Sequence, residues 1–228
     1  MPDKPPECSV IAELLPDYVR LACMRVQDAD PDVLEAEWPF IKKAVEKRRR
    51  EFSAGRTCAR QALRELGCAD APIVHNQNGA PLWPPGIVGS ITHSNTYAAA
   101  VAAESSRARG LGIDMETVSR VSPAIAGKIL TGPEQACLRQ QPNPPAQQRL
   151  LALYFSAKEA IYKCLHPLLL CRIGFEDARI EYTPGQGTIT ISLCPRIQSA
   201  APGVENLHGR YCYFDDTVCA AVWLETEA

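Results

Sequence analysis

The stretch of residues 110–116 constrains the fold of this chain most strongly, because it changes from apolar to acidic within the length of one strand. Its sequence, Gly-Leu-Gly-Ile-Asp-Met-Glu, predicts a β-strand with a buried start. Side chains of a strand alternate between its faces, so Asp114 and Glu116 share one face and Met115 points to the other. Two adjacent carboxylates repel each other unless a proton or a cation intervenes. We expect such a site here, and an exposed strand end is the alternative interpretation.

A later helical segment, residues 147–165, supplies a third carboxylate. Glu159 and Lys163 lie one turn apart on the same face, in the order that favours a helical ion pair. A surface ion pair would also explain this spacing. Our working hypothesis is that Asp114, Glu116 and Glu159 meet around a hard divalent cation. Mg²⁺ fits that set, because it binds carboxylate oxygens together with phosphates and waters.

Composition and charge exclude several classes of protein. The 228 residues are 46% hydrophobic and 22% charged, which is ordinary for a globular protein, and the net charge of -2 gives no general attraction to nucleic acid or membranes. The sequence shows neither an apolar signal segment nor an apolar run of membrane-spanning length. The ten cysteines contain no Cys-x-x-Cys pair, so we expect reduced, mostly buried thiols. These features predict a cytoplasmic protein that binds neither nucleic acid nor membranes.

The remaining patterns alternate between helical and strand periods and predict an α+β fold. We expect a loose N-terminus over residues 1–15 and turns or loops over 28–32 and 77–86. Gly67 is expected to end a helix. Helices are expected over 33–66, 122–130, 132–140 and 147–165. Strands are expected over 18–26, 87–92, 96–103, 110–116, 175–182, 188–193, 209–214 and 217–224.

The sequence contains signs of an internal repeat. Residues 96–101 (Thr-Tyr-Ala-Ala-Ala-Val) resemble residues 217–222 (Thr-Val-Cys-Ala-Ala-Val), and each forms the second strand of a predicted hairpin. Each hairpin is preceded by its own predicted helix, and both helices contain Phe-Ser-Ala, at residues 52–54 and 155–157. We therefore expect two similar α+β halves, residues 1–106 and 107–228, with the functional site between them.

Two further features could bind anions. The segment 42–60 is rich in lysine and arginine; such a run is usually a solvated helix face, although arginine also forms bidentate contacts with phosphate. His93 lies with Ser90, Thr92 and Ser94 at the mouth of a predicted hairpin, where a structural histidine is the commoner case. The sequence lacks a Gly-x-Ser-x-Gly elbow and a phosphate-binding glycine loop, so we assign neither serine as a nucleophile.

The acidic strand and the later helix together resemble the signature of the 4′-phosphopantetheinyl transferases. That family carries Gly-Ile-Asp-x-Glu, matched by residues 112–116, followed by (Trp/Phe)-x-x-Lys-Glu-Ala-x-x-Lys, matched by residues 155–163. Two other blocks, residues 48–56 and 83–93, agree as well. The whole is similar to the Sfp-type enzymes, in particular the branch that includes the enterobactin synthetase component and mycobacterial activating enzymes.

The resemblance implies a pseudo-dimer of two similar α+β halves and a specific reaction. The reaction moves 4′-phosphopantetheine from coenzyme A to a serine of an apo acyl or peptidyl carrier protein and releases 3′,5′-ADP. It implies Mg²⁺ at the pyrophosphate, with Mn²⁺ as an alternative. We expect a monomer, because one chain contains both halves.

The resemblance also implies roles for individual residues. The metal ligands would be Asp114, Glu116 and Glu159, and the catalytic residues would be Glu159, Lys163 and Asp114. Glu134 matches an acidic position that follows the metal strand. The coenzyme A contacts would be Arg48, Arg56, His75, Thr92, His93, Lys158 and Lys163. The chain departs from the family at Ala80, where relatives often carry a basic residue, and at His75, where some carry lysine.

Two other functions use the same features differently. A non-catalytic module could bind anions or nucleic acid through the basic helix, with affinity that depends on salt. A magnesium-dependent phosphohydrolase or nuclease could use the same carboxylates with water as the nucleophile.

Overall fold

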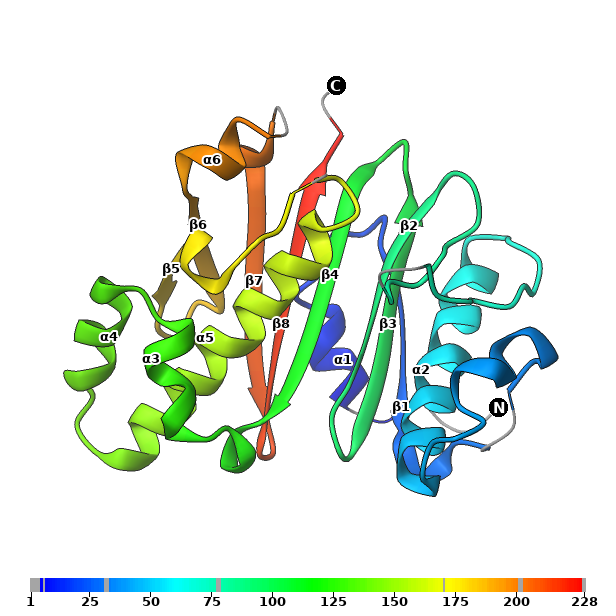
Figure 1. Ribbon diagram of the computed structural model, residues 1–228, viewed down its shortest axis with the longest axis horizontal. Helices are drawn as coiled ribbons and strands as arrows, with labels where there is room; N and C mark the ends of the chain where they lie inside the picture. The colour runs from blue at the N-terminus through cyan, green and yellow to red at the C-terminus, as the bar shows by residue number, and fades with distance from the viewer. Residues whose placement is uncertain are drawn as a thin grey trace.

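The computed structural model of the protein describes residues 5, 7–30, 33–76, 79–169, 171–200 and 203–226, and it contains two antiparallel sheets (Figure 1). The smaller sheet has the order β1-β3-β2, with β1 (Arg20–Arg25), β2 (Ile87–His93) and β3 (Tyr97–Glu104). The larger sheet has the order β4-β8-β7-β6-β5, with β4 (Ala108–Thr117), β5 (Ala178–Thr183), β6 (Thr188–Leu193), β7 (Leu207–Phe214) and β8 (Thr217–Glu225). The predicted α+β class is confirmed.

Two long helices pack on these sheets. Figure 1 shows α2 (Glu46–Glu65) against the smaller sheet and α5 (Pro144–Leu165) lying across the larger one. The shorter helices are α1 (Glu7–Ala12), α3 (Ala126–Ile129), α4 (Gly132–Arg139) and α6 (Pro195–Gln198). Short 3₁₀ helices occur at Val26–Asp28, Glu35–Phe40, Val118–Arg120, Pro123–Ile125, Phe175–Asp177 and Val204–Asn206.

Strand β3 explains how α2 approaches the smaller sheet so closely. Ala98, Ala100 and Ala102 face the core beneath α2, and Tyr97 and Val101 on the opposite face enter a second core. A strand buried on both faces reads as a continuous apolar run, as β3 does. The methyl groups of the alanines leave room for the helix to lie near the strand.

The second core joins the two sheets. It contains Leu111, Ile113 and Met115 from β4, alternate residues of β3 and β8, and Ile11 from α1. The alternation predicted for residues 110–116 is therefore confirmed, because these apolar side chains share one face of β4. The opposite face of β4, which carries Asp114, is left for α5.

Strands β2 and β4 lie side by side where the sheets meet, although they belong to different sheets (Figure 1). Two side-chain hydroxyls connect them. The Ile113 amide donates to Ser90 Oγ at 3.1 Å, and the Met115 amide donates to Thr92 Oγ1 at 3.0 Å. Hydroxyl groups of β2 thus take the place that main-chain carbonyls occupy in an ordinary ladder.

The N-terminal segment differs from its prediction. Residues expected to be loose form α1, and Cys8 of this helix is joined by a disulfide to Cys23 of β1, with 5.9 Å between their Cα atoms. The expectation that all cysteines are reduced is wrong for this pair. The contact depends on how α1 packs on β1, which the spacing of cysteines along the chain does not encode. The other cysteines are free thiols.

Most other predicted elements are present, with shifted ends. The segment predicted as one or two helices begins as the 3₁₀ helix Glu35–Phe40, and α2 starts only at Glu46. Gly67 follows α2 with φ +76°, as expected for a residue that ends a helix. Helix α5 begins at Pro144, because Asn143 accepts a hydrogen bond from the Ala146 amide and caps it.

Parts of two predicted turns, residues 31–32 and 77–78, lie outside the described residues. Within the described ranges, no helix is both long and apolar enough to cross a membrane.

Candidate active site

Two glycines of β4 bring the strand into direct contact with α5. A Cβ atom at Gly112 would lie 1.9 Å from the carbonyl oxygen of Ala160, and one at Gly110 would lie 2.6 Å from that of Cys164. Both glycines face α5, as does Asp114 two residues further on. The Gly-x-Gly-x-Asp pattern therefore lets the helix rest on the strand backbone, so that a short aspartate can reach side chains of α5.

Asp114 is held from two sides. Its side chain is buried, and Lys163 Nζ donates to Oδ1 at 2.7 Å and to the Ile113 carbonyl at 3.1 Å. Thr92 Oγ1 donates to the same Oδ1 at 3.3 Å. Asp114 Oδ2 is buried and has no hydrogen-bond partner among the residues that the structure describes. A buried carboxylate oxygen without a partner is costly, so this atom marks where a cation would find a ligand.

Glu116 and Glu159 share the electrostatic environment of Asp114. Burial, and then the charge of Asp114, raise the pKa of Glu116 to about 8, and the charge of Glu159 adds to this effect. Burial and the Asp114 charge also raise the pKa of Glu159, whereas Lys163 lowers it. Burial together with the nearby charge of Asp114 is the environment in which these two carboxylates favour either a proton or a bound cation.

The chemistry of this donor set fits a hard divalent cation, since the three side chains offer only oxygen ligands. Within the described ranges, however, no three His, Cys, Asp or Glu side chains converge closely enough to form a ready-made metal site. The ammonium group of Lys163 is the cation that contacts Asp114 in this structure. The fit therefore depends on the unpartnered Oδ2 and on the repulsion among the carboxylates.

Arg48 and His93 form a pair next to the carboxylates. Arg48 Nη1 lies 2.5 Å from His93 Nε2; a guanidinium only donates, so Nε2 accepts and the imidazole is neutral. Burial, followed by the Arg48 charge, lowers the pKa of His93. Glu51 lies 3.6 Å from Arg48 Nη1 and 3.8 Å from His93 Nδ1. The charges of Lys163 and Asp114 also act on the pKa of His93, so the pair lies near the carboxylates.

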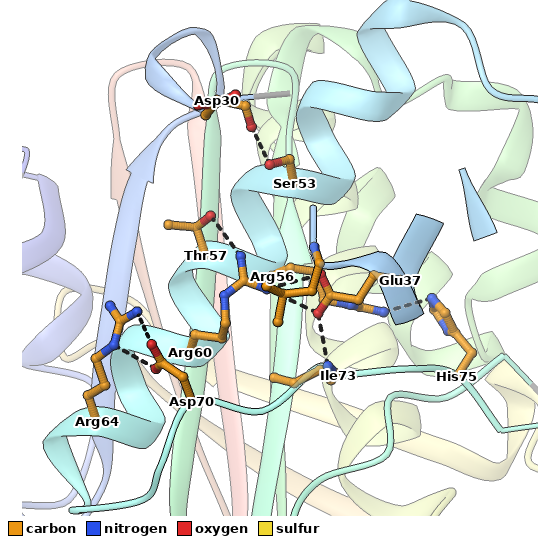
Figure 2. Close-up of polar contacts among 11 residues, drawn as sticks. Asp30, Glu37, Ser53, Arg56, Thr57, Arg60, Arg64, Asp70, Ile73 and His75 are labelled. Carbon is orange, nitrogen blue, oxygen red and sulfur yellow. Dashed lines mark hydrogen bonds and ion pairs between the residues drawn. The ribbon is translucent and has the colours of Figure 1, made fainter. Parts of the chain in front are cut away.

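Arg56 and His75 form a second pair of the same kind (Figure 2). Arg56 Nη2 lies 2.7 Å from His75 Nε2, and its guanidinium lies 4.3 Å from the centroid of the Phe52 ring. Arg56 is 4% exposed, and burial lowers its pKa to about 10. The nearby carboxylate of Glu37 is engaged instead by Arg60, at 3.0 Å to both of its oxygens. Arg56 is thus a buried cation, and within the described part of the chain its Nε has no hydrogen-bond partner, which suits an anionic ligand.

Lys158, which the resemblance assigns to coenzyme A, is engaged inside the protein in this structure. Its ammonium group is buried and donates to Glu134 Oε2 at 2.7 Å and to the carbonyls of Ile129 and Phe175 at 2.7 and 2.8 Å. All three of its donors are therefore used inside the protein. Adjacent helix residues point about 100° apart, so Lys158 faces a different side of α5 from Glu159.

Glu134, the acidic position that follows the predicted metal strand, has a structural role in addition to its contact with Lys158. It also accepts from the Thr131 amide at 2.7 Å, which caps α4, and from the Ile180 amide at 2.8 Å in β5. With Lys158 it forms a buried ion pair that connects α4, α5 and β5.

Sequence reasoning overlooked Ser156, which supports Asp114 from α5. Ser156 Oγ donates to the main-chain carbonyl of Asp114 at 3.0 Å and is fully buried. It lies within the matched helix motif, but a serine in a helix usually carries no signal of its own. Sequence reasoning also overlooked Phe40, whose ring centroid lies 5.0 Å from that of His75, because this contact joins two segments that are far apart in the sequence.

Comparison with known proteins decides the family. Residues 36–103 match the 4′-phosphopantetheinyl transferase N-terminal domain, and residues 110–222 match the 4′-phosphopantetheinyl transferase superfamily. The 4′-phosphopantetheinyl transferase PptT of Mycobacterium tuberculosis is 34% identical over 225 residues, which are 95% of this chain and 98% of PptT. The chain belongs to the 4′-phosphopantetheinyl transferase family. The family expected from the strand and helix motifs is confirmed.

Other phosphopantetheinyl transferases are similar over shorter stretches. Npt of Nocardia iowensis is 38% identical over 179 residues, which are 78% of this chain and 79% of Npt. The solved structure of the Thermotoga maritima holo-[acyl-carrier-protein] synthase has a TM-score of 0.43 and 25% identity, and covers 52% of this chain and 64% of that one. This phosphopantetheinyl transferase thus carries the acidic strand β4 and the helix α5 inside the matched superfamily region.

Proposed function

We propose that this phosphopantetheinyl transferase moves 4′-phosphopantetheine from coenzyme A to a serine of an apo acyl or peptidyl carrier protein at the Asp114 site. The arrangement of Asp114 carries the proposal. One of its oxygens is held by Thr92 and Lys163, and the other is buried without a partner. Such a carboxylate is ready to bind a cation at a position that Lys163 also reaches.

Asp114, Glu116 and Glu159 are the residues that would hold Mg²⁺, with Mn²⁺ as the alternative ion. When bound, such an ion offsets negative charge on the pyrophosphate of coenzyme A. The raised pKa values of Glu116 and Glu159 support this assignment, because both come from burial and then from the charge of Asp114, and a divalent cation offsets both effects.

The protein's own side chains account for the proton and the leaving group. The carrier serine oxygen attacks the β-phosphorus of coenzyme A, a new O–P bond forms, and the O–P bond to 3′,5′-ADP breaks. Glu159 is our candidate to accept the serine proton, since its carboxylate shares the electrostatic environment of Asp114 and Lys163. Lys163, whose side chain is 27% exposed, is our candidate to stabilise the leaving phosphate.

The two Arg–His pairs are our candidates for the nucleotide end of coenzyme A. Arg48 with His93, and Arg56 with His75, each present a guanidinium beside a neutral imidazole. Contacts remote from the reacting phosphorus supply binding energy that positions the substrate. We further propose that the site lies between the halves 1–106 and 107–228, which supply the Arg–His pairs and the carboxylates respectively. A single chain is then sufficient for activity.

The decisive test is a transfer assay. The protein is incubated with coenzyme A, Mg²⁺ and an apo carrier protein, and mass spectrometry follows the mass of the carrier. We expect a gain of one phosphopantetheine per carrier serine, and no gain when a chelator removes the metal. Hydrolysis of coenzyme A without modification of several different carriers would favour a phosphohydrolase instead.

Replacing Arg56 with alanine should raise the KM for coenzyme A. The lost interaction is a hydrogen bond from a charged donor, so we expect an increase of about 10–100-fold, with a smaller change in kcat. Arg64→Ala is the matched control on the same helix, because Arg64 pairs with Asp70 at 2.6 Å (Figure 2). A KM that is unchanged in Arg56→Ala, at normal kcat, would contradict the placement of Arg56 at the nucleotide.

The pH dependence of stability should report the carboxylate repulsion. The pKa of Glu116 is about 8 in the folded protein, above its usual value, so at intermediate pH the folded state holds a proton that the unfolded state has released. The stabilisation of the folded state by this proton is fully present at low pH and is lost as the pH rises through 8. The metal-free protein should therefore lose thermal stability as the pH rises from about 4.5, the usual pKa of a glutamate, to about 8. Mg²⁺ should raise Tm more at the upper end of that range, where the carboxylates are ionised.

Differential scanning fluorimetry with and without Mg²⁺ measures this effect. Glu116→Gln removes one of the repelling charges and should flatten the pH dependence of the metal-free protein. A Mg²⁺-induced rise in Tm that is the same at low and high pH would count against the shared carboxylate site.

A further inference from the structure

We propose that Thr92 is a positioning residue that orients the carboxylate of Asp114, so that Oδ2 is the oxygen presented to the divalent cation. This inference rests on the proposed function of the Asp114 site. It also replaces the expected contact between Thr92 and coenzyme A, since the Thr92 hydroxyl is used inside the protein.

The hydroxyl of Thr92 has a fixed orientation. A threonine hydroxyl has one proton to donate and lone pairs to accept with. The Met115 amide donates to Thr92 Oγ1 at 3.0 Å, and Thr92 Oγ1 lies 3.3 Å from Asp114 Oδ1 as its donor. Thr92 is 3% exposed, so water competes little for either bond.

Asp114 is correspondingly restrained. Its Oδ1 receives donors from both Thr92 and Lys163, and its main-chain carbonyl accepts from Ser156 Oγ at 3.0 Å. Rotation of the carboxylate about its terminal bond would break both bonds to Oδ1. Oδ2 therefore stays buried and, among the described residues, without a partner, so it is available to bind a ligand.

The restraint comes from the other sheet. Thr92 belongs to β2 in the smaller sheet, and Asp114 belongs to β4 in the larger one. Ser90 makes the same strand-to-strand contact through the Ile113 amide at 3.1 Å. The described hydrogen bonds of Ser90 include none to a carboxylate. Ser90 is therefore a natural control that separates holding the strands together from orienting Asp114.

The experiment compares three variants by Mn²⁺ binding, followed by the electron paramagnetic resonance signal of free Mn²⁺, with and without coenzyme A. Thr92→Val keeps the shape of the side chain and removes the hydroxyl, and it should weaken Mn²⁺ binding by about 10–100-fold, as is typical when a residue that orients a metal ligand is lost. Thr92→Ser keeps the hydroxyl and should bind Mn²⁺ like the wild type. Ser90→Ala should lower Tm about as much as Thr92→Val while leaving Mn²⁺ affinity unchanged.

The outcomes separate this inference from the function on which it rests. Equal Mn²⁺ affinity in the wild type and Thr92→Val overturns the positioning role, and a difference in Mn²⁺ affinity that appears only when coenzyme A is present assigns Thr92 to the cofactor instead. Equal losses of Mn²⁺ affinity in Ser90→Ala and Thr92→Val would show that Thr92 only connects the two strands, and this result also overturns the positioning role. Failure of the wild type to bind Mn²⁺ under either condition overturns the metal site itself. If Thr92→Val does not fold, Thr92→Ala is compared in the same way.

Discussion

Replacing Asp114 with alanine should reduce phosphopantetheine transfer by at least about 1,000-fold while the protein stays folded. The substitution removes the only carboxylate of the three that is described as both restrained and left with a free buried oxygen. It also releases Lys163 from its 2.7 Å contact. Lys163 is partly exposed and can be hydrated, so the fold should survive the loss of its partner.

Glu159→Ala should have a similar effect, because it removes both a proposed metal ligand and the candidate base. The rate of carrier modification by mass spectrometry measures both variants, and circular dichroism checks the fold. Glu181→Ala is the control, because this exposed carboxylate on β5 pairs only with Arg179 among its described contacts. Wild-type turnover by Asp114→Ala or Glu159→Ala would contradict the assignment of the metal site.

Replacing Gly112 with alanine should both destabilise the protein and impair transfer. The new Cβ would lie 1.9 Å from the Ala160 carbonyl oxygen, which is backbone and cannot rotate away. Helix α5 must then move off β4, and overpacking of this kind costs about 3 kcal/mol. For a chain of this size, that cost lowers Tm by roughly 6–12 °C. The shift also carries Glu159 and Lys163 away from Asp114.

Thermal unfolding and the transfer assay together measure this prediction. Gly127→Ala in α3 is the matched control, because a Cβ atom there would meet nothing within 4 Å. That variant should keep its activity, with a Tm equal to or slightly above that of the wild type. A Gly112→Ala protein that matches the wild type in both Tm and rate would show that the close contact between β4 and α5 is not required.

Local periodicity was sufficient to predict the main elements of this site. The alternation in residues 110–116 predicted that Asp114 and Glu116 share one face and that Met115 points to the other, and the structure buries Met115 with Ile113 in the core on that other face. The spacing of Glu159 and Lys163 predicted a shared helix face, and Lys163 reaches Asp114. These predictions succeeded because each depends on a single element whose geometry is regular.

Features that depend on how elements pack were not predictable from the same patterns. Lys158 lies next to Glu159 in the sequence, but its partners come from α3, α4 and the 3₁₀ helix Phe175–Asp177, which pack on a different side of α5. The Cys8–Cys23 disulfide requires α1 to pack on β1. The bond from Thr92 to Asp114 requires the two sheets to meet edge to edge. Each of these is a contact between segments whose relative position no local period records.

The hydroxyl contacts between β2 and β4 have a thermodynamic consequence for ligand binding. Because Thr92 and Asp114 come from different sheets, the free energy of holding this carboxylate depends on how the sheets are aligned. A ligand that contacts both sheets would favour one alignment and thereby change the affinity for a cation at Asp114. Coupling of this kind is reciprocal, so the cation would change the affinity for that ligand by the same factor.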